Sequence, residues 1–294
     1  MNVSRNEIHR FFIALESTQS NPEPVRRERE RYFKSALGRI HRLMGLIPER
    51  PESRVLEIGA SPFFASQAMI HFLRLEPGRF VMIDGAGPCD TCVEREKKTF
   101  FSRPYDLFRL NAETTPFPFA DESFDLVICQ DVIEHLLFDP LYLVQQCNRV
   151  LKKGGILILS TSPAVFSWHV TLRHLFNLTV EMGYDITHRN PYARHHRLYS
   201  LAEVRQMAAG NGFSVERAFV RSHWYRVDKG MNLRARFAKR AIHLLDRFSA
   251  ALSVVLPFLK EKAGSQIWVV GRKTAFSETI VYPRTLNMHS DFTE

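Results

Sequence analysis

The sequence lacks most of the features that mark secreted, membrane-spanning or zinc-stabilised proteins. Its first ten residues, Met1–Arg10, are polar, and no apolar segment with a small-residue cleavage site follows, so we expect no signal peptide. No window reaches the roughly 18 uninterrupted apolar residues of a spanning helix. Of the four cysteines, only Cys89 and Cys92 form a Cys-x-x-Cys pair, and a four-ligand zinc site would need two more partners. We therefore expect a cytoplasmic protein without a metal site, with a redox or zinc role for this pair as the less favoured alternative.

The bulk composition is that of a globular protein with an uneven charge. With 294 residues and 45% hydrophobic residues, the chain can form one large or two small domains. The net charge is +9, and the segment from Arg221 to Lys262 holds ten Lys/Arg against three Asp/Glu. Such a segment indicates either an anionic partner or a solvated basic face. We expect no nucleic acid partner, because no RNA-reading motif or aromatic stacking platform accompanies the charge.

The order of apolar patterns predicts an α/β fold. Ser4-x-x-Glu7 before an apolar helical spacing is a capping box, and a charged amphipathic helix follows over Val25–Leu46. From residue 54 onward strands and helices alternate, which is typical of a doubly wound, mostly parallel sheet. We expect seven strands, the last antiparallel, at Arg54–Ile58, Arg79–Ile83, Tyr105–Leu110, Leu126–Cys129, Ile156–Ser160, Ser214–Val220 and Gln266–Gly271. The predicted domains are an N-terminal helical cap (1–50), the α/β domain (51–275) with a helical insertion (232–259), and a C-terminal tail (276–294).

Polar residues follow the first three predicted strands, where ligands bind in open α/β sheets. The first strand ends in Val55-Leu-Glu-Ile-Gly-Ala-Ser-Pro62, and Gly59 lets the backbone approach a ligand closely. The second ends in Asp84-Gly85, whose carboxylate can accept two ribose hydroxyls or simply form a turn. Asn111-Ala112-Glu113 follows the third.

The segment Pro116–Leu136, PFPFADESFDLVICQDVIEHL, is the most informative part of the chain. A turn rich in Pro and acid, a short apolar strand and Glu-His-Leu resemble the fourth strand of a class I S-adenosylmethionine-dependent methyltransferase. The earlier segments match this family in order and spacing, although Ser61 and Phe63 occupy two of its usual glycine positions. The resemblance implies S-adenosylmethionine as cofactor, bound by Glu57, Gly59, Ala60, Ser61, Asp84, Gly85, Asn111, Ala112, Gln130 and Asp131. We expect His135 to pack beneath the site.

The segment from Thr187 to Ser200 is dense in His, Arg and Tyr. Its Pro-Tyr-x-Arg-His and Arg-x-Tyr-Ser pieces, like the Gly-Ala-x-Pro-aromatic turn, resemble a branch of the family associated with bacterial glycan biosynthesis. We expect His195 to act as the catalytic base or a substrate ligand, with His196 and His188 as weaker candidates. We expect Arg194, Arg197, Tyr192 and Tyr199 to bind the acceptor, an anionic one if the arginines pair with it. A basic surface loop with the tyrosines packed inward is the alternative.

Residues 232–259 form a basic amphipathic segment. Phe237, Ala241, Leu245, Phe248, Leu252 and Val255 recur at helical spacing, with Lys and Arg opposite. The stripe suits packing on the protein's own sheet, a homodimer, or peripheral contact with anionic lipid at the inner membrane surface.

These observations favour methyl transfer to oxygen, or less favourably nitrogen, of a glycan, a lipid-linked molecule or another small acceptor. The absent glycines leave open a catalytically silent methyltransferase-like protein that serves in binding or assembly. A nicotinamide-dependent oxidoreductase is a weaker alternative, because Gly-x-Gly-x-x-Gly is absent after the first strand.

Overall fold

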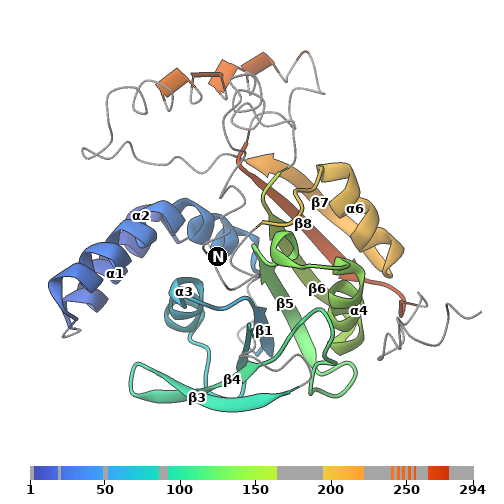
Figure 1. Ribbon diagram of the computed structural model, residues 1–294, viewed down its shortest axis with the longest axis horizontal. Helices are drawn as coiled ribbons and strands as arrows, with labels where there is room; N and C mark the ends of the chain where they lie inside the picture. The colour runs from blue at the N-terminus through green and yellow to red at the C-terminus, as the bar shows by residue number, and fades with distance from the viewer. Residues whose placement is uncertain are drawn as a thin grey trace, which may run out of the picture.

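A computed structural model of the chain describes residues 3–18, 21–48, 52–85, 92–163, 195–221 and 264–277, and positions 240–241, 244–245, 247–248, 251–252 and 255. A mixed sheet lies at its centre, with helices on both faces (Figure 1). The elements are α1 (Arg5–Ser17), α2 (Glu23–Leu46), β1 (Val55–Ile58), α3 (Phe64–Leu73), β2 (Phe80–Asp84), β3 (Glu94–Phe100), β4 (Arg103–Arg109), β5 (Phe124–Gln130), the 3-10 helix η1 (Ile133–His135), α4 (Pro140–Val150), β6 (Leu151–Thr161), α6 (Leu201–Gly210), β7 (Phe213–Arg221) and β8 (Gln266–Lys273).

The eight described strands lie in the order β3-β4-β2-β1-β5-β6-β8-β7. The five inner strands from β4 to β6 pair in parallel, while β8 is antiparallel to both β6 and β7. The strand order reverses between β1 and β5, whose last paired residues are Ile58 and Cys129. Ligands of doubly wound folds bind at the carboxyl ends of strands beside such a switch point.

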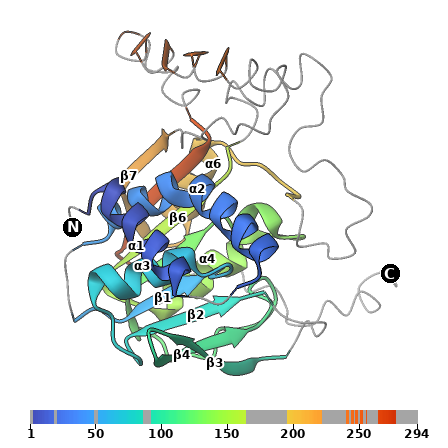
Figure 2. The same cartoon turned by 90° about the vertical axis from the view of Figure 1, so that its left-hand side faces the viewer.

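Two apolar clusters, one on each face of the sheet, hold the layers together. One joins α1, α2 and α3 to the sheet and includes Phe12, Leu43 and Trp268. The other joins α4 and α6 to the opposite face and includes Phe124, Leu143 and Val204. Figure 2 shows α1, α2 and α3 lying over the near face. Strands covered on both sides bury consecutive residues, as β1 does with all four of its own.

The doubly wound class and the antiparallel last strand are confirmed, and the strand count needs one addition. The seven predicted strands are β1, β2, β4, β5, β6, β7 and β8. The eighth strand, β3, forms an antiparallel hairpin with β4 at the edge of the sheet. The predicted capping box at Ser4 and Glu7 is present, with both reciprocal hydrogen bonds. The predicted domain boundaries at 50 and 275 stay a prediction.

Most described positions of the amphipathic segment are exposed, whereas Leu245 and Leu252 are half-buried. Leu244, Phe248 and Val255 are 69%, 63% and 76% exposed, so these side chains do not pack on the sheet. Among the residues that the structure describes, no helix is both long and apolar enough to cross a membrane.

Candidate active site

A cavity of about 520 Å³ opens at the carboxyl ends of β1 and β5, beside the switch point. Its walls come from the loop after β1, the turn between β5 and η1, helix α2, and single residues near β6 and β8. Six of the predicted cofactor residues line it: Glu57, Gly59, Ala60, Ser61, Gln130 and Asp131. Further lining residues include Tyr32, Arg39, Phe64, Glu134, His135, Ser162, His195 and Gln266.

The loop after β1 passes close to the turn after β5. Gly59 has φ +77°, and a Cβ atom added there would lie 2.4 Å from Val132 Cγ2. Phe63, at one of the usual glycine positions of the family, still adopts a left-handed conformation with φ 69° at the start of α3. The glycine-type backbone is therefore retained at Phe63 although the glycine is absent. This loop forms one wall of the cavity.

Asp131 is held between two distant parts of the chain. It has φ +52°, and its backbone N–H donates to the carbonyl oxygen of Ser160 over 3.0 Å. Its carboxylate pairs with Arg39 from α2 and accepts a hydrogen bond from Gln266 at the start of β8. These contacts fix the turn after β5 and tie α2 across the cavity.

Three carboxyl groups, those of Glu57, Asp131 and Glu134, line the same cavity. Burial raises the pKa of Glu57 to about 8, against a hydrogen bond from the Ser66 hydroxyl that lowers it, and the charge of Asp84 raises it further. Burial also raises the pKa of Glu134, and the neighbouring charge of Asp131 adds to this. Such a set of carboxyl groups favours a ligand that carries positive charge.

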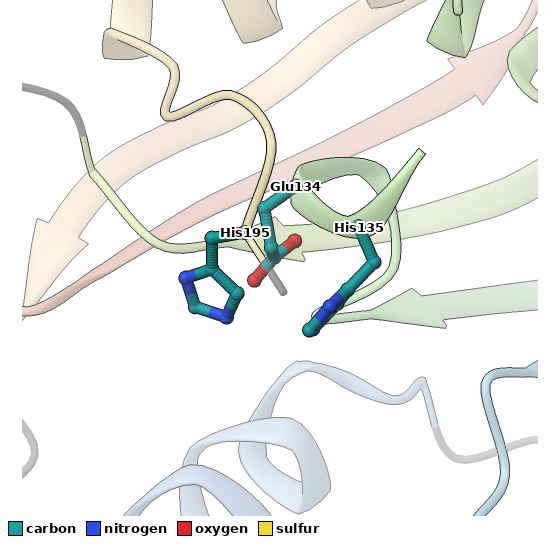
Figure 3. Close-up of side chains that lie close together, drawn as sticks. All are labelled: Glu134, His135 and His195. Carbon is teal, nitrogen blue, oxygen red and sulfur yellow. The ribbon is translucent and has the colours of Figure 1, made fainter. Parts of the chain in front are cut away.

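A cluster of Glu134, His135 and His195 forms one side of the cavity (Figure 3). Glu134 is fully buried and accepts hydrogen bonds from the Thr161 hydroxyl (2.6 Å) and the Ser162 backbone N–H (3.3 Å). The imidazole rings of His135 and His195 lie 4.6 Å apart between centroids, edge to face. His135, expected to pack beneath the site, thus lines it.

The other predicted cofactor residues lie outside the residues that line the cavity. Asp84 at the end of β2 forms an ion pair with Arg109 over 2.7 Å. Asn111 is buried and its side-chain oxygen accepts a hydrogen bond from the Glu113 backbone over 3.0 Å. Gly85 follows β2, and Ala112, like Asn111, follows β4. The contacts of these four residues with an adenosine stay a prediction.

Of the described residues predicted to act on or bind the acceptor, one lines the cavity and the others do not. His195 lines the cavity, whereas His196 and Arg197 are exposed and absent from its lining. Arg197 forms an ion pair with Glu203 over 2.8 Å, and Tyr199 is buried beneath it. Burial raises the pKa of Tyr199 to about 12, which suits a packing residue. His188, Tyr192 and Arg194 lie outside the described residues.

The sequence gives no signal for several cavity residues. Arg39 and Tyr32 belong to a helix whose charged pattern resembles any solvated face, and Gln266 begins a strand 135 residues after Asp131. Their roles depend on tertiary contacts that no local motif encodes. Placement at the cavity could be predicted only for residues at or directly after the ends of the predicted strands.

Part of the chain is similar in sequence to known methyltransferases. Residues 64–159 match the family described as a methyltransferase domain. The chain is 32% identical over 120 residues to a ubiquinone biosynthesis O-methyltransferase of Xanthomonas campestris, covering 40% of this chain and 47% of that protein. It is 34% identical over 99 residues to a probable S-adenosylmethionine-dependent methyltransferase of Mycolicibacterium smegmatis, covering 34% of this chain and 32% of that protein. The matches thus span less than half of each relative.

The fold has counterparts among solved structures. One such structure is a complex of the Haloferax volcanii Trm112 methyltransferase activator with a methyltransferase. The aligned chain of that complex has a TM-score of 0.50 and 14% identity, and the alignment covers 84% of this chain and 91% of that chain. This likeness shows the fold alone. Residues 64–159 are therefore similar to a methyltransferase domain, and most of the chain shares the fold of this solved structure.

Proposed function

We propose that this protein transfers a methyl group from S-adenosylmethionine to an oxygen atom of a small acceptor, a glycan or a lipid-linked molecule. The observation that carries the proposal is the cavity at the switch point between β1 and β5, lined by Gly59 and three carboxyl groups. S-adenosylmethionine supplies a methyl group on a positively charged sulfur, which is already activated for transfer. The protein then needs to bind the cofactor and the acceptor, to orient them toward each other, and to exclude water.

The charges of the cavity suit such a cofactor. Glu57 near the end of β1 and Asp131 directly after β5 lie on either side of the switch point, and a cationic ligand between them would favour the ionised form of both carboxyl groups. The rings of Tyr32 and Phe64 stack beside the cavity with centroids 5.6 Å apart, and aromatic faces attract cations. The Arg39–Asp131 pair joins α2 to this wall.

Oxygen is favoured as the acceptor atom by two observations. The Xanthomonas relative is named an O-methyltransferase. A buried carboxyl group and two imidazoles also stand on one side of the cavity, where a hydroxyl could be held and deprotonated. A glycan or lipid-linked acceptor is supported by the resemblance of the Thr187–Ser200 segment to the glycan-associated branch.

Calorimetry with S-adenosylmethionine and S-adenosylhomocysteine tests the cofactor part of the proposal. We expect binding of both, with Gly59 and Asp131 variants weakened. Incubation of the protein with methyl-labelled cofactor and an extract of source cells should yield a labelled product whose mass identifies the acceptor. Binding without any product would favour the catalytically silent alternative, and nicotinamide binding in place of S-adenosylmethionine would favour the oxidoreductase.

We further propose that the amphipathic segment contacts an anionic membrane surface. Leu244 and Phe248 are largely exposed beside the exposed basic side chains of Arg240 and Arg247, and apolar groups next to cations suit the headgroup region. We expect the protein to sediment with vesicles containing anionic lipid at low salt and to be released by high salt. A Leu244→Ser/Phe248→Ser variant should lose this binding. Association of two protein copies without vesicle binding would instead indicate a homodimer.

A further inference from the structure

We propose that Glu134, His135 and His195 bind a divalent transition-metal ion at the edge of the cavity. The ion would hold the acceptor oxygen beside the methyl donor. The role of the ion in holding the acceptor rests on the proposed function, whereas the binding of the metal does not. The sequence predicts no metal site, because these three residues belong to segments about 60 positions apart and follow no ligand spacing that could be read in advance.

The geometry of the three side chains suits a shared ion. One ligand atom from each residue lies within 4.8 Å of the others. Donors around one ion at roughly 2.1 Å are separated by about 3.0–3.4 Å, so modest side-chain rotations would close the set. Figure 3 shows the Glu134 carboxylate between the two imidazoles, with the three side chains directed to the same side of the chain. All three residues line the cavity, which leaves further coordination positions for a substrate.

The backbone holds the two segments of the cluster together. Helix η1 carries Glu134 and His135 directly after β5. The backbone carbonyl of Glu134 accepts hydrogen bonds from the N–H groups of His196 (2.7 Å) and Arg197 (3.4 Å), which follow His195 in the chain. Tyr199 adds a β-bridge to Pro163 beside β6. His195 is therefore placed next to Glu134 by main-chain contacts.

The partners of the Glu134 carboxylate orient it and leave its charge in place. The Thr161 hydroxyl and the Ser162 N–H are neutral donors that fix the carboxylate, as outer partners of metal ligands do. Glu134 is fully buried, and a buried carboxylate is costly unless a positive charge offsets it. A divalent cation at this position would supply that charge.

The donor set indicates which metal ions fit. Two imidazoles and one carboxylate suit zinc, manganese, iron or cobalt, whereas Mg²⁺ and Ca²⁺ prefer sites built from oxygen alone. The chemistry that follows is Lewis-acid assistance. The ion would lower the pKa of an acceptor hydroxyl and fix its direction. The hydroxyl proton passes to water, the oxygen forms a bond to the methyl carbon, and the carbon–sulfur bond breaks with its electron pair staying on sulfur.

The test is metal binding by the untagged full-length protein, measured without cofactor or acceptor. After treatment with a chelator and its removal, we expect the protein to bind one Mn²⁺ or Zn²⁺ per chain, by electron paramagnetic resonance for manganese and by elemental analysis for zinc. His135→Ala, His195→Ala and Glu134→Gln should each weaken binding roughly 100-fold or more. Thr161→Val should weaken it about 10- to 100-fold, and His196→Ala, next to the cluster, should leave it unchanged.

The outcomes are separable from those of the proposed function. Near-native melting of the His135 and His195 variants, with cofactor affinity retained, shows that they fold. Absence of metal binding at micromolar concentration, or binding that the three ligand variants do not change, would overturn the metal site. If His195 is instead a simple base, His195→Ala abolishes turnover while metal content stays the same. Failure to bind S-adenosylmethionine would remove the proposed function and leave the metal result standing.

Discussion

Replacement of Gly59 by alanine is expected to remove most cofactor binding and to destabilise the fold by about 2–4 kcal/mol. Two physical costs add. An L-residue at φ +77° is strained, and the new methyl group would lie 2.4 Å from Val132 Cγ2. Val132 has a stiff, branched side chain and directly follows Asp131, so relief of the clash moves the turn that lines the cavity. We expect at least a tenfold loss of affinity for S-adenosylmethionine, measured by calorimetry, and a lower free energy of unfolding in urea.

Two further variants separate these costs. Gly154 has φ +76°, almost the value of Gly59, yet nothing lies within 4 Å of a Cβ atom added there. Gly154→Ala should therefore show the conformational cost alone, about 1–2 kcal/mol, with cofactor affinity unchanged. Adding Val132→Ala to Gly59→Ala should recover part of the stability by making room for the methyl group. Equal destabilisation by Gly59→Ala and Gly154→Ala would contradict the close approach of the two loops.

The strands that could be predicted from the sequence are those whose burial requires a continuous run of apolar residues. β1, β2 and β5 are apolar on both faces because helices cover both sides of the sheet, and their boundaries follow to within about two residues. β3 has no such apolar run. Its sequence Glu94–Phe100 is charged and largely exposed, and it exists as a strand because β4 pairs with it through register contacts such as Lys97 with Asp106. Edge strands of this kind depend on the partner.

The same distinction applies to the site. Gly59, Gln130 and Asp131 were accessible to prediction because carboxyl ends of neighbouring parallel strands meet at one edge. Arg39 was not, because its contact with Asp131 spans 92 positions and depends on how α2 crosses the sheet. His135 illustrates a second limit. Its neighbour in the cavity, His195, comes from a segment 60 positions later in the chain, and the sequence does not show that the two imidazole rings lie 4.6 Å apart.

The stability of the protein is expected to fall as the pH rises from about 5 to 8, and Glu57 is expected to account for a large part of the change. Its pKa is about 8 in the folded protein, against an ordinary value of 4.5. Between these values the folded state holds a proton that the unfolded state has lost, so the free energy of unfolding decreases with pH, by at most about 1.4 kcal/mol per unit. The contribution is fully present below the unfolded pKa and is lost once the pH passes the folded one.

Glu57→Gln isolates this effect, because glutamine has nearly the same shape, can still accept the hydrogen bond of Ser66, and does not ionise. The charge of Asp84 and the carboxyl groups of Asp131 and Glu134 remain in the variant, so their titration is common to both proteins. Urea unfolding at about pH 5.5 and pH 8, with a chelator present, should show the wild-type protein losing about 2 kcal/mol more than the variant. Parallel pH curves for the two proteins would mean that Glu57 is already ionised in the fold. In that case the carboxylate would have to be solvated or paired, and the cavity would attract a cation without first releasing a proton. A difference of the expected sign instead implies that binding of a cationic cofactor near Glu57 is coupled to release of that proton, because the ligand favours the ionised carboxylate that the empty fold disfavours.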